Sequence, residues 1–374
     1  MNWRTLLAEE PLPAAIVDLD AVDANLALVL EKSRVPVRLA TKSMRIPWLT
    51  RYLLDRGLRG IMAYSLEEAA GLVSLGFDDV LVAYPLAHAG EAARLGEMLD
   101  RVRVIIDCVE HVELLRSLPG ARVCLDVDVS LRMAGQHLGV MRSPVRDVAA
   151  ARGLARRATD AGLVVDGVMA YEAQVAGVQD GTGLRGLAIG WMKARSVALA
   201  AARRAEVVAA LRADGHPVTV VNGGGSGSLT STPADASVTE VTAGSALLAG
   251  HLFDGYRDLP FRPASFFALR VVRRPDAGHV TCFGGGIVAS GAWGPDRAPI
   301  VHWPVGLTPL SLEGWGEVQT PFRVNGADVA IGDPVLCRPA KSGEWLERFP
   351  RVLCVRGEQI VERVPTYRGL GWAS

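Results

Sequence analysis

The chain has 374 residues, and its 40 lysines and arginines balance its 40 aspartates and glutamates. This neutral balance gives no support for nucleic acid or an anionic membrane surface as a partner, so a small molecule is the expected ligand. The length suits a β/α barrel of roughly 250 residues together with a second, smaller domain.

The five cysteines are scattered without CxxC spacing, which is typical of reduced, buried thiols rather than of a disulfide scaffold or a zinc site. No apolar run reaches the length of a membrane span. The first residues also lack the basic start and the long apolar region of a signal peptide. We therefore expect a cytoplasmic protein with no membrane partner.

From residue 14 onward, short apolar runs alternate with helical patterns at the intervals of βα units. The runs lie at 14–17, 37–41, 60–64, 80–83, 102–106, 123–127, 164–169, 218–221 and 238–241. Such a series predicts parallel strands with right-handed crossovers, and a closed eight-stranded barrel fits the count better than an open sheet. One run is surplus, and the first is either peripheral to the barrel or its first strand. Ser65 and Glu68 predict a capping box at one helix start.

The pattern changes after Tyr256, where short strand-like pieces broken by glycine and proline replace the helical patterns. This change predicts a mostly β domain. We expect the barrel to cover residues 14–258, and the β domain to combine residues 1–13 with residues 259–374.

Lys42 follows the apolar run 37–41, at the carboxyl end of a predicted buried strand. An unpaired ammonium loses hydration there, so such a lysine either reaches solvent or has a chemical role. The glycine-rich run 222–228 follows another predicted strand, and its backbone N–H groups and serine hydroxyls can surround a phosphate. Because phosphate sites after the last two strands recur in β/α barrels, the lysine and this loop together suggest pyridoxal phosphate (PLP).

Five stretches of the chain resemble the PLP enzymes with the alanine racemase fold, and within them the group of D-threonine aldolase and D-serine dehydratase. The stretches are 38–42, 126–128 with Arg132 and Gly135, 167–172, 224–228 and 239–245. The resemblance covers nearly the whole chain. It implies an α/β fold, a (β/α)8 TIM-type barrel that binds PLP with a C-terminal mostly β domain, and a homodimer that acts on an amino acid.

The resemblance also implies roles for single residues. Lys42 is the expected Schiff-base lysine, Arg132 the candidate for the phenolic oxygen of PLP, and Tyr171 a residue beside the ring. The remaining expected PLP-binding residues lie in or beside the phosphate loop: Asn222, Gly224, Gly225, Ser226, Gly227, Ser228 and Ser245.

The chain departs from this branch at the metal site of the β domain. Lys341 to Gly343 stand where the metal ligands are expected, and neither lysine nor glycine offers an anionic or soft ligand. Glu172 stands where the branch often has a histidine. We therefore expect no metal.

In racemase-fold dimers the β domain of one subunit completes the other subunit's active site. Lys341, Glu344, Tyr367 and Arg368 are therefore candidates to lie across a partner's PLP, and solvated turns with local ion pairs are the alternative. Lys341 and Tyr367 are the expected catalytic partners of Lys42.

The first functional hypothesis is a PLP-dependent lyase that acts at the α-carbon, most simply a D-3-hydroxy amino acid aldolase without metal. The alternatives are a racemase or epimerase that uses Lys42 and Tyr367 on opposite faces of the cofactor, or a deaminase. A non-catalytic PLP carrier is a further alternative, but carriers of this fold lack a second domain.

Overall fold

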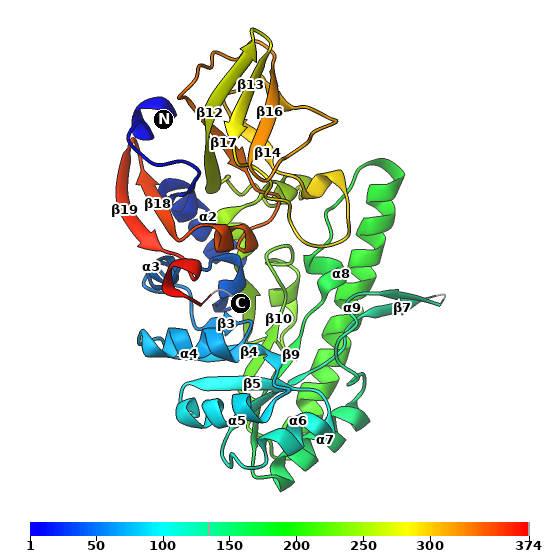
Figure 1. The fold of residues 1–374 in the computed structure, drawn as a ribbon. Coiled ribbons are helices and arrows are strands. Elements are labelled where there is room, and N and C mark those ends of the chain that lie inside the picture. The colour runs from blue at the N-terminus through cyan, green and yellow to red at the C-terminus, as the bar shows by residue number, and fades with distance from the viewer. Residues whose placement is uncertain (134, 373–374) are drawn as a thin grey trace.

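The computed structural model, which describes residues 1–133 and 135–372, contains the predicted closed barrel (Figure 1). The last strand of the barrel pairs in parallel with the first through Val241 and Val37. In order around the barrel, the eight strands are β10 (Val220–Gly223), β11 (Glu240–Ala243), β2 (Val37–Ala40), β3 (Ile61–Ala63), β4 (Val80–Pro85), β5 (Val102–Ile106), β6 (Arg122–Asp126) and β9 (Val164–Ala170).

Helices follow the barrel strands, and a long one runs along one side of the molecule (Figure 1). They are α3 (Pro47–Leu54), α4 (Leu66–Ser74), α5 (Ala89–Leu95), α6 (Val109–Leu115), α7 (Val148–Asp160), α8 (Ala173–Ala176), the long α9 (Gly183–Ala213) and α10 (Ser245–Leu248). The expected Ser65 cap of α4 is confirmed, because Ser65 Oγ accepts the Glu68 N–H at 3.1 Å. The Glu68 carboxylate also reaches back, but it accepts the Tyr64 N–H at 2.7 Å rather than that of Ser65. In the chain, a hairpin of β7 (Leu131–Met133) and β8 (Gln136–Leu138) comes between β6 and α7. It projects from the barrel (Figure 1).

The rest of the chain builds a nine-stranded sheet, which confirms the mostly β character expected after residue 259. Its strands are β1 (Ala14–Asp18), β12 (Ser265–Asp276), β13 (His279–Phe283), β14 (Ile300–Trp303), β15 (Leu307–Pro309), β16 (Gln319–Val324), β17 (Pro334–Arg338), β18 (Arg351–Arg356) and β19 (Gln359–Pro365). The short helix α1 (Trp3–Leu6) precedes β1.

β1 is the surplus run, and of the two expected positions it takes the one outside the barrel. It pairs antiparallel with β12 and parallel with β18, so it belongs to the sheet and not to the barrel. The physical reason is closure: β2 already pairs with β11, and the closed barrel has no free edge for another strand. Helix α2 (Leu19–Lys32) then leads the chain into the barrel.

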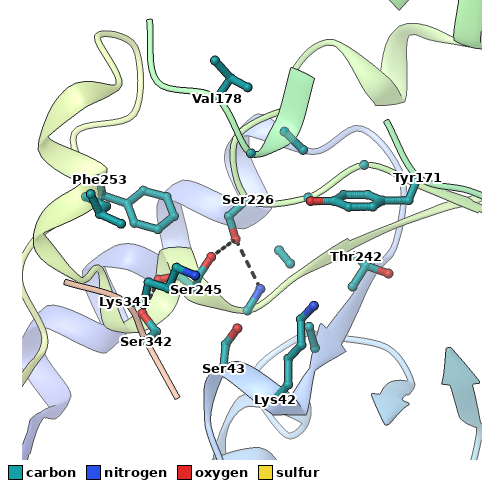
Figure 2. A pocket seen from close by; sticks show the side chains of 18 of the residues that line it. Lys42, Ser43, Tyr171, Val178, Ser226, Thr242, Ser245, Phe253, Lys341 and Ser342 are labelled. Carbon is teal, nitrogen blue, oxygen red and sulfur yellow. Dashed lines mark hydrogen bonds between the residues drawn. The ribbon is translucent and has the colours of Figure 1, made fainter. Parts of the chain in front are cut away.

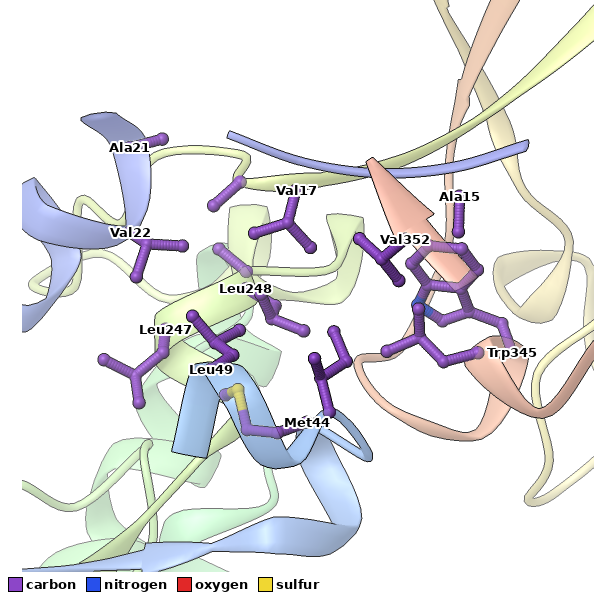
Figure 3. Close-up of a cluster of buried hydrophobic side chains, with 14 of the residues drawn as sticks. Ala15, Val17, Ala21, Val22, Met44, Leu49, Leu247, Leu248, Trp345 and Val352 are labelled. Atoms are coloured by element: carbon purple, nitrogen blue, oxygen red, sulfur yellow. The ribbon is translucent and has the colours of Figure 1, made fainter. Parts of the chain in front are cut away.

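One cluster of buried apolar side chains joins the sheet to the barrel (Figure 3). Val17 of β1 and Val352 of β18 belong to the same cluster as Met44, Leu49 and Leu248, which follow barrel strands. Because Met44 and Leu248 follow the carboxyl ends of β2 and β11, the sheet packs at this end of the barrel. Burial of shared apolar surface therefore holds the two parts together.

Ion pairs occupy the interior of the barrel. Arg38 of β2 is 1% exposed and pairs with Glu240 of β11 at 2.6 Å and with Asp79 at 3.1 Å. Arg103 of β5 pairs with Asp166 of β9 at 2.7 Å. The five cysteines, all in the described part of the chain, are free thiols. None of the described helices combines the length and apolar character of a membrane span.

Candidate active site

A cavity of about 880 Å³ lies at the carboxyl ends of the barrel strands, with walls from both the barrel and the sheet domain. Its volume is within the usual range for ligand sites. Figure 2 shows side chains from distant parts of the sequence that converge on it. The structure brings together these predicted residues at its surface: Lys42, Tyr171, Asn222, Gly224, Gly225, Ser226, Ser245 and Lys341.

Lys42 lies in a single 3-10 turn, Thr41–Ser43, directly after β2. Its side chain is open to the cavity, but the surrounding protein limits its access to bulk water. This burial lowers the pKa of Lys42, and the positive charges of Arg142 and Arg45 lower it further. A lowered pKa increases the neutral fraction of the amine, which is the form that attacks the aldehyde carbon of a cofactor such as PLP.

The predicted phosphate loop forms one wall of the cavity. Ser226 Oγ accepts hydrogen bonds from the Gly244 N–H at 3.3 Å and from the Ser245 hydroxyl at 3.2 Å (Figure 2). It also accepts the Ala246 N–H at 3.1 Å. Since these donors occupy its oxygen, the Ser226 hydroxyl proton remains available to an acceptor in the cavity.

The glycines at this wall leave space that a side chain would fill. A Cβ at Gly225 would lie 3.0 Å from the Ala176 Cβ, and a Cβ at Gly244 would lie 2.5 Å from the Ala40 carbonyl oxygen. Neutral hydroxyls and close backbone groups beside an open amine fit a phosphate-bearing aldehyde. The donor set and the space therefore match PLP.

Gly227 and Ser228 support this wall from behind and do not line the cavity. Ser228 Oγ accepts the Gly225 N–H at 3.1 Å, and a Cβ at Gly227 would collide with the Ala176 carbonyl. These two predicted residues shape the loop from outside the cavity. The sequence pattern could not separate the two roles, because both kinds of residue are small and adjacent.

Glu172 is a supporting residue whose role the sequence reasoning missed. Its buried carboxylate accepts the Gly224 N–H at 3.1 Å and the Thr232 hydroxyl, and it pairs with Arg204 at 3.1 Å. It thereby fixes Gly224, the first residue of the loop after β10. The sequence signal for this role was a carboxylate that closely follows a buried strand in a chain that also has a glycine-rich turn after another strand.

Arg132 does not lie where we expected it. Its side chain is 45% exposed on β7 and pairs with Asp128 at 3.3 Å, and it does not line the cavity. Successive side chains of a strand point to opposite faces, so the burial of Leu131 turns Arg132 outward. Arg142, in the segment between β8 and α7, lines the cavity instead, with its guanidinium 5.8 Å from the centre of the Tyr171 ring.

Tyr367 is also misplaced by the sequence reasoning, since it is fully buried away from the cavity. Its hydroxyl donates to the Glu68 carboxylate at 2.6 Å, and its ring lies 5.2 Å from that of Trp372. Burial, followed by the negative charge of Glu68, raises the pKa of Tyr367 well above its usual value. The C-terminal segment folds back onto α4, so Tyr367 does not reach this cavity.

Lys341 and Glu344, which we expected to lie across a partner's PLP, line the cavity of their own chain. The segment that carries them folds over the barrel mouth, where the Ser342 hydroxyl donates to the Ser245 carbonyl at 3.1 Å and Gly343 packs on the Lys42 carbonyl. Burial lowers the pKa of Lys341. The cavity therefore contains two amines from one chain.

Asp107, Cys108 and His111 form a group of potential metal ligands within the described residues, and their ligand atoms lie within 4.8 Å of one another. They lie where β5 leads into α6, and none of them lines the cavity.

The comparisons with known proteins agree with this architecture. Residues 17–251 match the family of alanine racemase N-terminal domains. The structure of D-threonine aldolase from Filomicrobium marinum has a TM-score of 0.82 and 22% identity, over 97% of this chain and 96% of that chain. D-threo-3-hydroxyaspartate dehydratase from Delftia sp. HT23 has a TM-score of 0.75 and 20% identity, over 96% of this chain and 98% of that chain.

Alanine racemase from Bacillus anthracis with bound L-Ala-P has a TM-score of 0.68 and 15% identity, over 95% of this chain and 98% of that chain. No curated protein matches the sequence. At these identities the structural likeness supports the fold, whereas the family match covers more than half of the chain, including Lys42 and the phosphate loop. The chain therefore belongs to the alanine racemase family of PLP-dependent enzymes, with a β/α barrel and a C-terminal β domain.

Proposed function

We propose that the protein is a PLP-dependent lyase that cleaves the Cα–Cβ bond of D-3-hydroxy amino acids without a metal ion. The observation that carries the proposal is the presence of two amines, Lys42 and Lys341, in one cavity beside a hydroxyl-rich phosphate wall. PLP, when bound, supplies an electron sink for a bond broken at the α-carbon. Lys42 would hold the aldehyde carbon of this cofactor, and Gly225, Ser226 and Ser245 would hold its phosphate.

Arg142 takes the anion-binding place that we expected for Arg132. Its guanidinium lines the cavity near Tyr171, and its positive charge lowers the pKa of Lys42. A guanidinium cannot be deprotonated in a protein, so it supplies a permanent positive charge to an anionic oxygen in the cavity.

Lys341 is the proposed acid–base group. Since burial lowers its pKa, a larger fraction of its amine is neutral and can accept the proton of the substrate's β-hydroxyl. As that proton leaves, the Cα–Cβ bond breaks and the β-carbon departs as an aldehyde. A proton returned to the α-carbon completes the release of the shortened amino acid.

A product assay tests this function against its alternatives. The purified protein is incubated with D- and L-3-hydroxy amino acids in deuterated water, and three outcomes are distinguished by their products. Aldehyde and glycine indicate the lyase, ammonia and a keto acid indicate a dehydratase or deaminase, and α-deuteration without cleavage indicates a racemase. Formation of neither aldehyde nor glycine from any of these substrates would refute the proposal.

A further inference from the structure

Asp126 is a buried carboxyl group that the proposed reaction does not use. It ends β6 and is 6% exposed. Its backbone carbonyl accepts the Ser143 hydroxyl at 2.6 Å, but no hydrogen bond or ion pair to its side chain is found in the described ranges 1–133 and 135–372. A buried carboxylate without a partner is costly, so its surroundings indicate what it can bind.

A second cavity, of about 10 Å³, lies at this carboxyl group. Asp126, Ser143, Arg142 and Tyr171 are among the residues that line it. Arg142 and Tyr171 also line the active-site cavity, so they form the wall between the two spaces. A polar space of this size holds about one water molecule, which is enough to bridge a carboxylate and a guanidinium.

The neighbouring charges make Arg142 the cation available to Asp126. Asp107, which follows β5, and Asp128, after β6, are carboxyl groups whose charges raise the pKa of Asp126, so neither can be its cation. Asp128 is already engaged, since it pairs with Arg132 at 3.3 Å and with Arg146 at 3.2 Å. Arg142, by contrast, has no ion pair or hydrogen bond among the residues that the structure describes, apart from its approach to the Tyr171 ring.

We propose that Asp126 is a positioning residue that holds the Arg142 guanidinium at the wall of the active-site cavity, close enough to act on Lys42. The positive charge of Arg142 lowers the pKa of Lys42, so the position of this guanidinium sets how much of the Lys42 amine is neutral. The functional consequence rests on the proposed role of Lys42.

The attraction between Asp126 and Arg142 depends on pH. Burial, followed by the charges of Asp107 and Asp128, raises the pKa of Asp126 to about 7, although Arg142 opposes the shift. Asp126 is therefore ionised, and attracts Arg142, mainly above neutral pH. Tyr171 is the remaining titratable group at the small cavity, and burial raises its pKa, so it stays neutral in this range.

A double-mutant cycle on the PLP-free protein tests the coupling without any assay of turnover. The readout is the rate at which trinitrobenzenesulfonate modifies Lys42 at pH 8, followed by peptide mass spectrometry. Asp126→Asn should slow this modification about threefold, because the released Arg142 would no longer lower the pKa of Lys42 as strongly. A threefold change corresponds to a rise of about half a unit in the pKa of Lys42. The same substitution in an Arg142→Gln background should leave the rate unchanged, because the guanidinium through which Asp126 acts is absent.

Asp107→Asn is the matched control, since it removes a neighbouring carboxylate that lines neither cavity, and it should leave the rate at pH 8 unchanged. Equal effects of Asp126→Asn with and without Arg142 would overturn the proposal. Borohydride labelling with PLP is run in parallel. If another lysine reacts with PLP, the proposed function fails, whereas the coupling between Asp126, Arg142 and the Lys42 amine is still measured.

A second measurement keeps Asp126 intact. Its pKa is higher in the folded than in the unfolded protein, so the folded state binds more protons between about pH 4 and pH 7, and its contribution to stability falls as the pH rises through this window. Arg142→Gln should raise the folded pKa further and extend the fall above pH 7. Urea titrations at pH 7 and pH 8 measure the free energy of unfolding of the wild type and of Arg142→Gln. The same change in this free energy between the two pH values in both proteins would contradict the proposal.

Discussion

Two of the chain's four lysines, Lys42 and Lys341, open into the active-site cavity. They reach it differently. Lys42 extends from the turn after β2, while Lys341 comes from the segment after β17 that folds over the barrel mouth. Burial lowers the pKa of both amines, and the positive charge of Lys42 lowers the pKa of Lys341 further. Two amines in this arrangement are expected to divide cofactor attachment and proton transfer between them.

Lys42→Ala should abolish covalent attachment of PLP. The alanine has no amine for the cofactor's aldehyde, although the phosphate wall remains. Borohydride reduction followed by peptide mass spectrometry should find the label on Lys42 in the wild type and none in the variant. Lys32→Ala, at the end of α2 and outside the cavity, is the control and should be labelled normally. A label on another lysine in the wild type would refute the assignment.

Lys341→Ala should lower turnover by about 10²-fold while PLP remains bound, because acid–base groups typically contribute at least this much. Lys341→Arg keeps the charge but cannot accept a proton, so it should not restore turnover. Chelators should leave the activity of the wild type unchanged. Loss of activity on chelation, restored by manganese or zinc, would contradict the proposal and indicate metal ligands in the site.

At the scale of elements, the loop after β10 is held by residues that do not touch the cavity. Glu172, which lies between β9 and α8, accepts the Gly224 N–H, and Ser228 accepts the Gly225 N–H, so two neighbouring amides of the loop are fixed from behind. The cavity face of the loop is therefore shaped by close packing as well as by its glycines.

Gly225→Val should weaken PLP binding strongly, since a Cβ there already meets Ala176 at 3.0 Å and the Tyr171 ring at 3.4 Å. The dissociation constant is measured by titration of PLP absorbance. Gly153→Val, in α7, is a better control than a β-domain glycine such as Gly285, because a Cβ at Gly153 meets open space whereas Gly285 has a φ of +128°. Equal losses in the two variants would mean that the loop does not hold the phosphate.

At the scale of the whole molecule, buried charges help to close the barrel. The pair between Arg38 and Glu240 links β2 to β11, the junction at which the barrel closes, and Asn222 donates to the same carboxylate at 2.8 Å. The Glu240 carboxylate therefore contacts both Arg38, at the junction where the barrel closes, and Asn222, which lines the active-site cavity.

Arg38→Met should lower the free energy of unfolding by about 3–5 kcal/mol, because it leaves the buried Glu240 carboxylate without its cation. Urea denaturation measures the change. Arg116→Met, which removes an exposed pair with Glu113 on α6, is the control and should leave the urea midpoint near that of the wild type. A similar midpoint for both variants would show that the buried pair does not contribute to barrel stability.

The homodimer and the cytoplasmic location remain predictions from the family resemblance and the sequence composition. Light scattering of the purified protein measures the oligomeric state. A second copy is not needed to bring Lys341 to the cavity, because the same chain supplies it.

Local patterns in the sequence determined the barrel, the β character of the C-terminal part, the Ser65 cap of α4 and the place of Lys42. Apolar periodicity and strand-end chemistry depend on residues close together in the chain, so they can be read without coordinates. The place of the glycine- and serine-rich loop at the strand end could be predicted for the same reason, since its residues are consecutive.

Only the tertiary structure decided which charged and hydroxyl groups face the cavity. Arg132 lies on the first strand of the hairpin and points away from the cavity, whereas Arg142 follows the hairpin and lines the cavity. Tyr367 is buried against Glu68, and β1 joins the sheet because the barrel is already closed. Each of these outcomes depends on contacts between residues far apart in the chain. Local patterns fix the type of each element, whereas burial against distant elements fixes which side chains remain accessible.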